Sequence, residues 1–490
     1  MKRLLAVLLT LVMAFGVAGC NGNSNKKGAD SGKVPTLTWY VPGDPQNDID
    51  EINQAASEIT REKIGANIEI KFIDTGAYKE RISMNMASSA EFDLCFIGYL
   101  YPYSDAVNMG GLLEIGDLLE KYAPDLLKSM PSYFIEAATT EEGIYAVPNQ
   151  QITGFGDGVY IRKDLAEKYN VDVATINNLE DLEPFAQLIK DNEPELVPCV
   201  KLSSSSFIDK EAMNSKVKTM VIASPTVWWD IEKEKAIPLY ERPGIKESAK
   251  KVNEWYKKGY IRQDVAINAD SGLGDSYSRA GRYAIVTETN KPGVLADIKT
   301  MTGFEYIEAF TTPPVMAYNS PLSTTIAVSR TSKNPEEAVK FINLINTDKE
   351  LYNLICFGIE GKHYTYENNR VHQIENSGWA PSADWKFGNQ FNALLKEGQS
   401  DDDWKKTEEL NDMAVKAPFM GIFFNTDDVL TELAQISKIN EQYVTALMDT
   451  GVQDPDSYWN EYIAAMKKAG IEKVVEHYQT QIDEFMKNKK

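Results

Sequence analysis

Hydrophobic and polar positions follow two alternating periods in the first part of the chain. Residues 37–41 (LTWYV) and 93–97 (DLCFI) are apolar runs typical of buried strands, and residues 67–73 alternate between apolar and polar. Residues 48–64 and 78–88 carry their apolar side chains at helical spacing. This strand–helix–strand–helix–strand order predicts parallel strands joined by right-handed crossovers.

The middle of the chain repeats this alternation. Strands are expected at residues 159–161, 220–222, 227–229 and 282–286, with a helix over residues 179–190. The length remaining after the first 20 residues suggests two or three domains. The pattern therefore predicts an α/β fold with more than one domain.

Two further helical segments have clear boundaries. A helix begins at Asn334-Pro335-Glu336, with proline in its first turn, and ends near Asn346. Residues 456–490 are helical in pattern, with Gly470 between two amphipathic halves. We expect these halves to form a helical pair packed on the body of the protein.

The N-terminus has the pattern of an export signal. Lys2 and Arg3 precede an uncharged apolar run, which ends at Val17-Ala18-Gly19-Cys20. The run is shorter than the ~20 residues of a membrane-spanning helix, so cleavage is favoured over a permanent transmembrane anchor. The last four residues resemble a lipobox, in which Cys20 becomes the new N-terminus and carries a diacylglycerol.

Residues 21–33 follow as a polar, Gly- and Asn-rich stretch, which predicts a flexible tether with a reach on the order of 20 Å. The net charge of −21 becomes −23 once Lys2 and Arg3 are removed. Such acidity argues against binding nucleic acid or anionic lipid. The alternative, a cationic substrate, is weaker, because charge spread over a surface usually serves solubility.

Cysteine and histidine give no metal-binding pattern. Three cysteines remain besides Cys20, so at least one thiol is expected to be free. No pair of residues among Cys95, Cys199, Cys356, His363, His372 and His477 has zinc-ligand spacing. We therefore expect neither a metal nor another cofactor.

Several segments together resemble the family-1 extracellular solute-binding proteins of ABC transporters, in particular a lipoprotein subgroup with an extra C-terminal helical region. Besides the lipobox, these segments are residues 90–94 (AEFDL), 143–148 (GIYAVP), 281–284 (GRYA), 332–338 (SKNPEEA), 358–364 (GIEGKHY) and 385–391 (WKFGNQF). Each motif is weak alone, but their order covers nearly the whole mature chain.

The resemblance implies a periplasmic-binding-protein-like fold, with two discontinuous α/β lobes around a hinge and cleft, plus C-terminal helices. The expected parts are a signal peptide (1–19), a tether (20–33), lobe 1 (34–150 and 287–346), lobe 2 (151–286 and 347–440) and the C-terminal helical pair (441–490). Crossings between the lobes are expected near Asn149, at 287–290 and after residue 346.

Aromatic and polar residues in the expected loops suggest a sugar site. Ligands of such sheets bind beyond the carboxyl ends of the strands, which points to residues 42–48, 74–77 and 98–108. Sugars need flat aromatic faces together with carboxylates or amides that bind hydroxyl groups. The candidate ligand-binding residues are Trp39, Asp44, Asp74, Tyr99, Tyr101, Asn149, Trp228, Trp229, Glu288, Asn290, Trp379, Trp385 and Asn389.

Some of these residues also have a purely structural interpretation. Trp39 lies inside a strand, where core packing is equally expected, and Asp44 could serve only its turn. Trp228 and Trp229 are adjacent on a strand, so at most one faces a given cleft. Glu288 and Asn290 could form a solvated turn. His363 is expected to complete a local hydrogen-bond network rather than contact ligand.

The sequence thus predicts a monomeric lipoprotein on the outer face of the cell membrane, following the resemblance a Gram-positive one. It would capture a small polar solute, with an oligosaccharide favoured, and deliver it to ABC permease subunits. Alternatives are a solute sensor that signals to a membrane kinase, a peptide receptor and an extracellular glycoside hydrolase. The chain has no G-x-S-x-G, H-E-x-x-H or P-loop motif, and we expect no enzymatic activity.

Overall fold

The computed structural model describes residues 34–199, 219–223, 225–266 and 276–488. The expected signal peptide, the tether and the lipidation site Cys20 lie outside these residues. No helix within the described ranges combines the length and the apolar character needed to cross a membrane.

A five-stranded sheet organises the first lobe, in the order β2-β1-β3-β15-β6. Its strands are β1 (Thr36–Pro42), β2 (Asn67–Ile73), β3 (Leu94–Gly98), β6 (Ala146–Pro148) and β15 (Thr324–Val328). β1 is parallel to β2 and β3, which confirms the predicted parallel strands, whereas β15 is antiparallel to β3 and β6.

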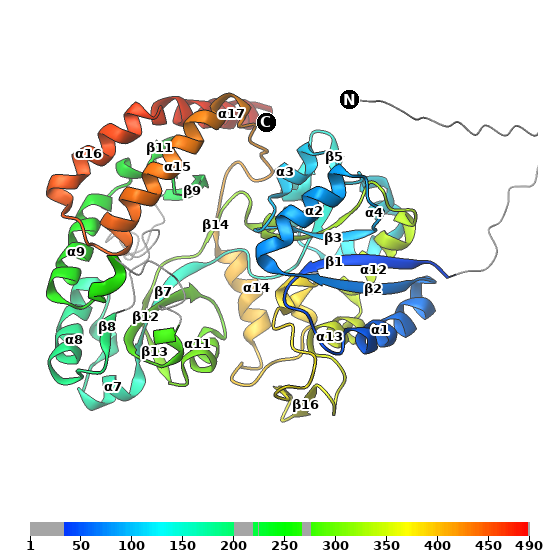
Figure 1. Cartoon of the computed structure of the whole chain (residues 1–490), viewed down its shortest axis with the longest axis horizontal. Helices are drawn as coiled ribbons and strands as arrows, with labels where there is room; N and C mark the ends of the chain where they lie inside the picture. The colour runs from blue at the N-terminus through cyan, green and yellow to red at the C-terminus, as the bar shows by residue number, and fades with distance from the viewer. Residues whose placement is uncertain (1–33, 200–218, 224, 267–275, 489–490) are drawn as a thin grey trace, which may run out of the picture. The chain divides into compact units, whose positions relative to one another are not determined.

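Helices cover both faces of this sheet (Figure 1). α1 (Ile49–Ile64), α12 (Pro335–Thr347) and α13 (Lys349–Phe357) share one apolar core with the sheet. α2 (Tyr78–Ala87) packs into a second core on the other face. The sheet is therefore buried on both sides, as its nearly continuous apolar strands require.

The second lobe contains a four-stranded sheet in the order β13-β7-β12-β8. Its strands are β7 (Gly156–Arg162), β8 (Val197–Cys199), β12 (Tyr283–Asn290) and β13 (Tyr306–Thr311). α8 (Leu179–Asn192) and α9 (Ile245–Lys258) contribute to the core on one face, and α11 (Val294–Thr302) packs on the other.

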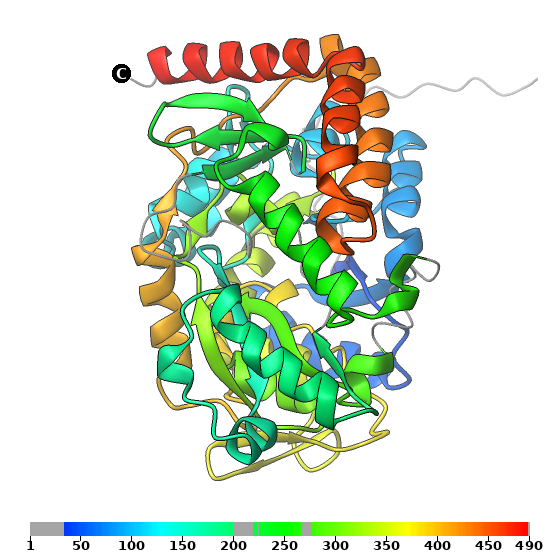
Figure 2. The same ribbon diagram turned by 90° about the vertical axis from the view of Figure 1, so that its left-hand side faces the viewer.

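A smaller sheet and the C-terminal helices form a separate core in the same lobe. The strands are β9 (Thr219–Ala223), β10 (Val227–Asp230) and β11 (Lys235–Pro238), and the helices are α15 (Leu430–Val444), α16 (Pro455–Lys468) and α17 (Ile471–Asn488). Figure 2 shows α17 lying across this sheet, where the side-chain oxygen of Gln479 accepts a hydrogen bond from the Ala236 amide at 2.7 Å.

The lobe boundaries differ from those expected. Residues 287–311 were assigned to lobe 1, but β12 and β13 both pair with β7, so this segment belongs to the second lobe. Residues 347–440 were assigned to lobe 2, but α13 and residues up to Ala393 pack in the core of the first lobe. Ladder hydrogen bonds and burial decide both assignments, and neither is visible in local sequence.

Within the described residues, three segments connect the lobes: residues 149–155, 312–316 and 413–417. The first matches the crossing expected near Asn149, whereas the other two replace those expected at 287–290 and directly after 346. β14 (Val315–Met316) pairs in parallel with β18 (Val415–Lys416), and β14 also bridges to Phe155. The connecting segments are thus hydrogen-bonded to one another.

Candidate functional site

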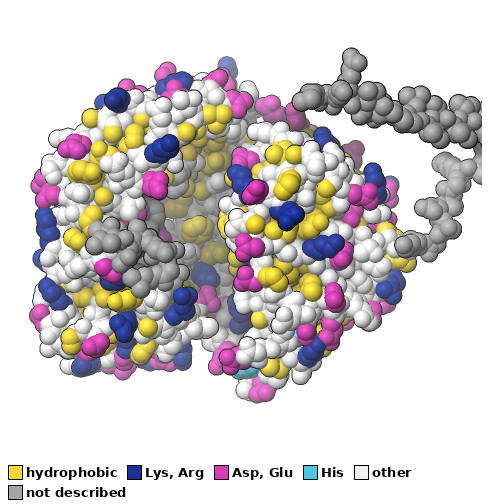
Figure 3. Space-filling model, in the orientation of Figure 1, with side chains coloured by type: hydrophobic (Ala, Val, Ile, Leu, Met, Phe, Trp, Pro, Cys, Tyr) yellow, Lys and Arg dark blue, Asp and Glu magenta, His cyan; other side chains and the backbone are white. Residues whose placement is uncertain are grey.

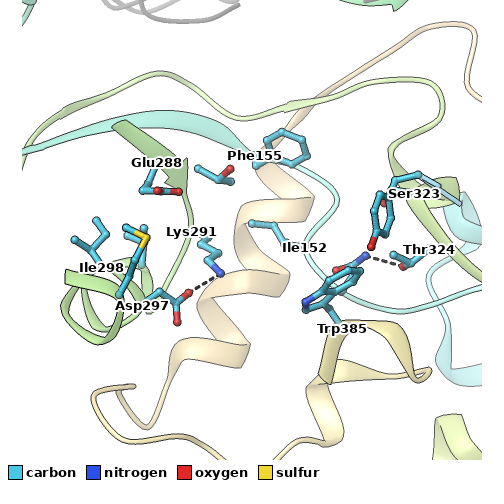
Figure 4. Close-up of a pocket in the computed structure, with 14 residues that line it drawn as sticks. Ile152, Phe155, Glu288, Lys291, Asp297, Ile298, Ser323, Thr324 and Trp385 are labelled. Carbon is cyan, nitrogen blue, oxygen red and sulfur yellow. Dashed lines mark hydrogen bonds and ion pairs between the residues drawn. The ribbon is translucent and has the colours of Figure 1, made fainter. Parts of the chain in front are cut away.

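A cavity of about 440 Å³ opens between the two lobes. Figure 3 shows the surface hollowed there, with hydrophobic side chains on the walls. Figure 4 shows Ser323, Thr324 and Trp385 on one side, and Glu288, Lys291, Asp297 and Ile298 on the other. Gln151, Ile152 and Phe155 of the first connecting segment also line the cavity.

An aromatic pair forms the wall on the first lobe. The rings of Tyr99 and Trp385 have centroids 5.8 Å apart and are tilted by 55°. Tyr99 directly follows β3, and its amide donates to the Ser323 carbonyl at 2.8 Å. Its side chain is 51% exposed, although burial of the hydroxyl group still raises its pKa. The pair thus presents ring surface to the cavity.

The close approach of β3 and β15 fixes the position of Tyr99. A Cβ atom at Gly98 would lie 2.1 Å from the Ser323 carbonyl oxygen, so only glycine fits there. Next to this contact, Gln151 Nε2 donates to Thr324 Oγ1 at 2.7 Å. Hydroxyl and amide groups therefore border the aromatic pair, as recognition of a polyhydroxylated ligand requires.

Trp385 is held from behind by Asn149. The Asn149 Nδ2 group donates to the Lys386 carbonyl at 2.9 Å and to the Trp385 carbonyl at 3.4 Å. The Lys386 ammonium lies 5.0 Å from the Trp385 ring and donates to the Pro42 carbonyl at 3.0 Å. Burial lowers the pKa of Lys386, and the nearby Asp44 opposes this shift.

The wall on the second lobe combines charge with apolar surface. Lys291 pairs with Asp297 at 2.7 Å, at the start of α11. Burial raises the pKa of Glu288, which follows the buried part of β12, while Lys291 opposes the shift. Val294, Ile298 and Met301 supply the apolar part of this wall.

The sequence-based candidates Tyr99, Glu288 and Trp385 line this cavity together. Trp39 and Trp379 do not, because both side chains are completely buried. Trp39 packs against Phe341 and Phe387, while Trp379 packs against Phe72 and donates from Nε1 to the Ile355 carbonyl at 3.1 Å. The expectation of ligand contact is therefore corrected for these two residues.

Trp228 and Trp229 also lie away from the cavity, in β10. The Arg242 guanidinium covers the Trp228 ring at 3.7 Å, and Trp229 packs against Phe419 with centroids 5.2 Å apart. Both tryptophans belong to the core shared with the C-terminal helices. They serve packing, because the sheet that carries them is covered by those helices.

The remaining candidates have local roles or different surroundings. Asp74 and Asn389 accept backbone hydrogen bonds at the start of short 3₁₀ turns. Tyr101 is 1% exposed, with its hydroxyl 3.1 Å from Met109 Sδ, and Asn149 is equally buried. Asp44 is exposed, and Asn290 lines a neighbouring cavity. His363 is buried and its Nε2 lies 3.1 Å from Asp48, as expected of a network residue.

The sequence interpretation missed Phe155, Gln151, Lys291 and the apolar face of α11. Phe155 lies between two glycines, Gly154 and Gly156. An aromatic residue in such a glycine-rich, non-periodic stretch could have been proposed as a ligand contact. In sequence, the apolar residues of α11 have the spacing of any helix that packs on a core. Their exposure to the cavity depends on where the neighbouring sheet ends, which the sequence does not show.

The part of the chain that the structure describes shows no arrangement suited to binding a metal ion. Among the described residues, no cluster of three or more His, Cys, Asp or Glu side chains is arranged to hold a metal ion. Cys95, Cys199 and Cys356 are buried free thiols, so the prediction of at least one free cysteine is confirmed.

Comparison with known proteins shows to which family the chain is related. Residues 46–351 match the family described as bacterial extracellular solute-binding protein, and residues 418–487 match a domain of unknown function, DUF3502. A carbohydrate ABC transporter substrate-binding protein of Streptococcus pneumoniae is 30% identical, over 100% of this chain and 99% of that protein.

Solved structures agree. The crystal structure of an N-glycan transport solute-binding protein (NgtS) from S. pneumoniae has a TM-score of 0.81 and 27% identity, covering 93% of this chain and 100% of that one. Its complex with Man5GlcNAc has a TM-score of 0.70 and 28% identity, covering 93% and 99%. A solute-binding protein from Bifidobacterium longum infantis, at 17% identity and a TM-score of 0.65 with 92% and 98% covered, shares the fold. The chain therefore belongs to the family of bacterial extracellular solute-binding proteins.

Proposed function

We propose that this protein captures an oligosaccharide in the cavity between its lobes and delivers it to the permease of an ABC importer. The observation that carries this proposal is the Tyr99–Trp385 pair, which lines the cavity and faces Glu288 and the Lys291–Asp297 pair across it. The identity of 27–30% to carbohydrate- and N-glycan-binding proteins supports it.

The two walls suit the two sides of a pyranose. Ring faces bind its C–H side, while carboxylate and amide groups bind its hydroxyls. Because the walls belong to different lobes, a bound sugar would bridge them and stabilise a closed arrangement. A permease can then distinguish the closed, loaded protein from the open one without any chemistry on the solute.

The proposal includes an anchored location. The lipobox-like sequence ending at Cys20 supports lipid attachment, and two acyl chains suffice for stable membrane binding. A single chain that works next to its permease has no need of a partner subunit, so we infer a monomer. Metabolic labelling with palmitate, in the intact protein and in Cys20→Ala, tests the attachment.

Calorimetry tests the binding function. The mature protein should bind Man1GlcNAc or a related neutral oligosaccharide, and Trp385→Ala should weaken binding about tenfold, which equals roughly 1.4 kcal/mol. The matched control Tyr366→Ala removes an aromatic residue that is 39% exposed and remote from the cavity, and it should leave binding unchanged. Binding of peptides but of no oligosaccharide would refute the proposal in favour of a peptide receptor.

Two observations distinguish transport from sensing: whether permease genes or a kinase gene lie beside this gene, and whether the protein supports uptake when it is reconstituted with its permease. Uptake of labelled oligosaccharide should require this protein together with its permease. A ligand-dependent change in the activity of a membrane kinase, without uptake, would support the sensor alternative.

A further inference from the structure

A second cavity, of about 470 Å³, lies beside the first one, between α11 and α14 (Asp403–Met413). Lys291 and Val294 line both cavities, so the two are neighbours that share part of their wall at the N-terminal end of α11. Each cavity has a volume within the range of ~300–1,000 Å³ found for small-molecule sites. The described residues thus border two neighbouring cavities of similar size.

The second cavity has exposed apolar walls. Met413, the last residue of α14, is 69% exposed, and Leu295 on α11 is 39% exposed. Exposed apolar side chains that gather around a hollow are typical of a surface that a ligand covers. No aromatic residue lines this compartment, whereas Tyr99, Phe155 and Trp385 line the first.

Its charged groups favour an uncharged, hydroxyl-bearing ligand. Lys291 is paired with Asp297 at 2.7 Å, and Lys406 with Asp402 at 3.0 Å. Glu308, on β13, has no ion pair with any residue that the structure describes, and burial raises its pKa. The compartment therefore offers a free carboxylate as hydrogen-bond acceptor, while its cations are already neutralised. Neither lysine that lines this compartment is left unpaired for an anionic group.

We propose that the cavity between α11 and α14 is a second compartment of the binding cleft, which holds further uncharged sugar units of an oligosaccharide whose first units lie at Tyr99 and Trp385. This inference rests on the proposed function and extends it to ligand size and charge. A disaccharide would fill only the first compartment, and a longer or branched neutral glycan would use both.

Two glycans of different size test the inference. Man1GlcNAc and Man5GlcNAc are titrated by calorimetry into the mature wild-type protein and into the double variant Glu308→Ala/Met413→Ala. The variant should bind Man5GlcNAc at least about fivefold more weakly, since it loses a charged hydrogen-bond acceptor and apolar contact. Its affinity for Man1GlcNAc should change less than about twofold. The matched control is Glu58→Ala/Met84→Ala, two exposed residues on α1 and α2 that line neither cavity.

The outcomes separate the two proposals. Unchanged Man5GlcNAc binding by the Glu308/Met413 variant overturns the second compartment and leaves the proposed function intact. Equal weakening for both glycans also overturns it, because the residues would then act on the first cavity or on the fold. If the wild-type protein binds neither these nor other oligosaccharides, the proposed function fails and the inference fails with it.

A charged ligand gives an independent measurement. A neutral oligosaccharide should bind more tightly than one of equal length that ends in a uronic acid. Glu308→Gln should reduce the difference in affinity between the neutral and the acidic oligosaccharide, because it removes the negative charge and keeps the size of the side chain. An equal or stronger preference for the acidic ligand in the wild-type protein contradicts the expected charge selection.

Discussion

Asn149 links the connecting segment to the aromatic wall through a single buried amide. Its Nδ2 group holds the backbone of Trp385 and Lys386, whereas its Oδ1 atom has no hydrogen-bond partner among the described residues. Because Asn149 is only 1% exposed, we expect it to position Trp385 rather than to contact ligand. This role was not anticipated, because the sequence suggested direct contact.

Asn149→Ala is expected to weaken oligosaccharide binding about fivefold, since Trp385 loses the donor that fixes its backbone. In a Trp385→Ala background the same change should have less than about a twofold effect. Calorimetry on the four proteins of this cycle measures the coupling. Equal effects in both backgrounds would show that Asn149 does not act through Trp385.

Asp157, the second residue of β7, makes stability depend on pH. Burial raises the pKa of its carboxyl from 3.8 to about 6, and Arg242 opposes the shift only partly. Well below pH 3.8 the group is protonated in both the folded and the unfolded state. As pH rises through about 6, the folded protein must ionise a buried carboxyl group, so its contribution to stability is lost.

Asp157→Asn removes this ionisation. The variant should melt at a higher temperature than the wild-type protein at pH 7.5, and the difference should shrink towards pH 4. Thermal unfolding followed by circular dichroism across this range measures it. A difference that does not vary with pH would contradict the assignment to Asp157.

At the level of elements, α14 is attached to the first connecting segment through Asn411. Asn411 Oδ1 accepts from the amides of Thr153 and Gly154 at 2.7 and 2.9 Å, and its Nδ2 donates to the Gln151 carbonyl at 2.9 Å. At Gly154 a Cβ atom would lie 2.4 Å from Ala414 Cβ, so the two segments pack without room for a side chain. One asparagine thus satisfies three backbone groups of a buried, non-helical stretch.

Asn411→Ala should lower the free energy of unfolding by about 2–4 kcal/mol, because buried backbone donors lose their acceptor. Asn411→Asp keeps that acceptor and, once its carboxyl group is protonated at low pH, a donor to Gln151 as well, so its cost should be smaller at about pH 4 than at neutral pH, where a buried carboxylate faces the Gln151 carbonyl. Urea unfolding of both variants at the two pH values checks this. An equal cost of the two substitutions at the lower pH would show that the amides of Thr153 and Gly154 find other partners.

Strands β6, β8, β13 and β15 were not predicted, whereas β1, β2, β3, β7 and β12 could be predicted from their apolar runs or alternation, because such patterns are local. The face of α11 could not. Val294 and Ile298 pack on Tyr160 and Val286 and also border the cavity, so one helix face serves core and site together. The spacing of residues along the chain shows that one face of a helix is apolar. It does not show which part of that face is covered by the sheet and which part is left open to a cavity.

At the level of the whole molecule, the C-terminal helices are part of the second lobe. Ile482 of α17 is 1% exposed and shares a core with Trp228 and Trp229 of β10, far away in sequence. The region that matches the domain of unknown function, residues 418–487, thus supplies one half of this core. It is not an appendage of an otherwise complete solute-binding protein.

Ile482→Ala should cost about 2–5 kcal/mol of unfolding free energy, because it removes buried apolar volume from this shared core. The substitution should also lower the denaturant concentration at which the fluorescence of the β10 tryptophans reports unfolding. Leu430→Ala, on α15 and 55% exposed, is the matched control and should change stability little. A large loss at Leu430 and none at Ile482 would contradict the described packing.

The sequence by itself determined the α/β class, the parallel strands β1, β2 and β3, the presence of at least one free thiol and the family. It did so because periodicity and motifs are local properties of the chain. The tertiary structure alone decided which tryptophan is available to a ligand: Trp39 and Trp379 are covered by Phe341, Phe387 and Phe72, whereas Trp385 remains beside Tyr99 at the cavity. It likewise decided the lobe boundaries, because hydrogen-bonded ladders join segments that lie more than 100 residues apart. Exposure and pairing depend on what distant residues do, and no local pattern records that.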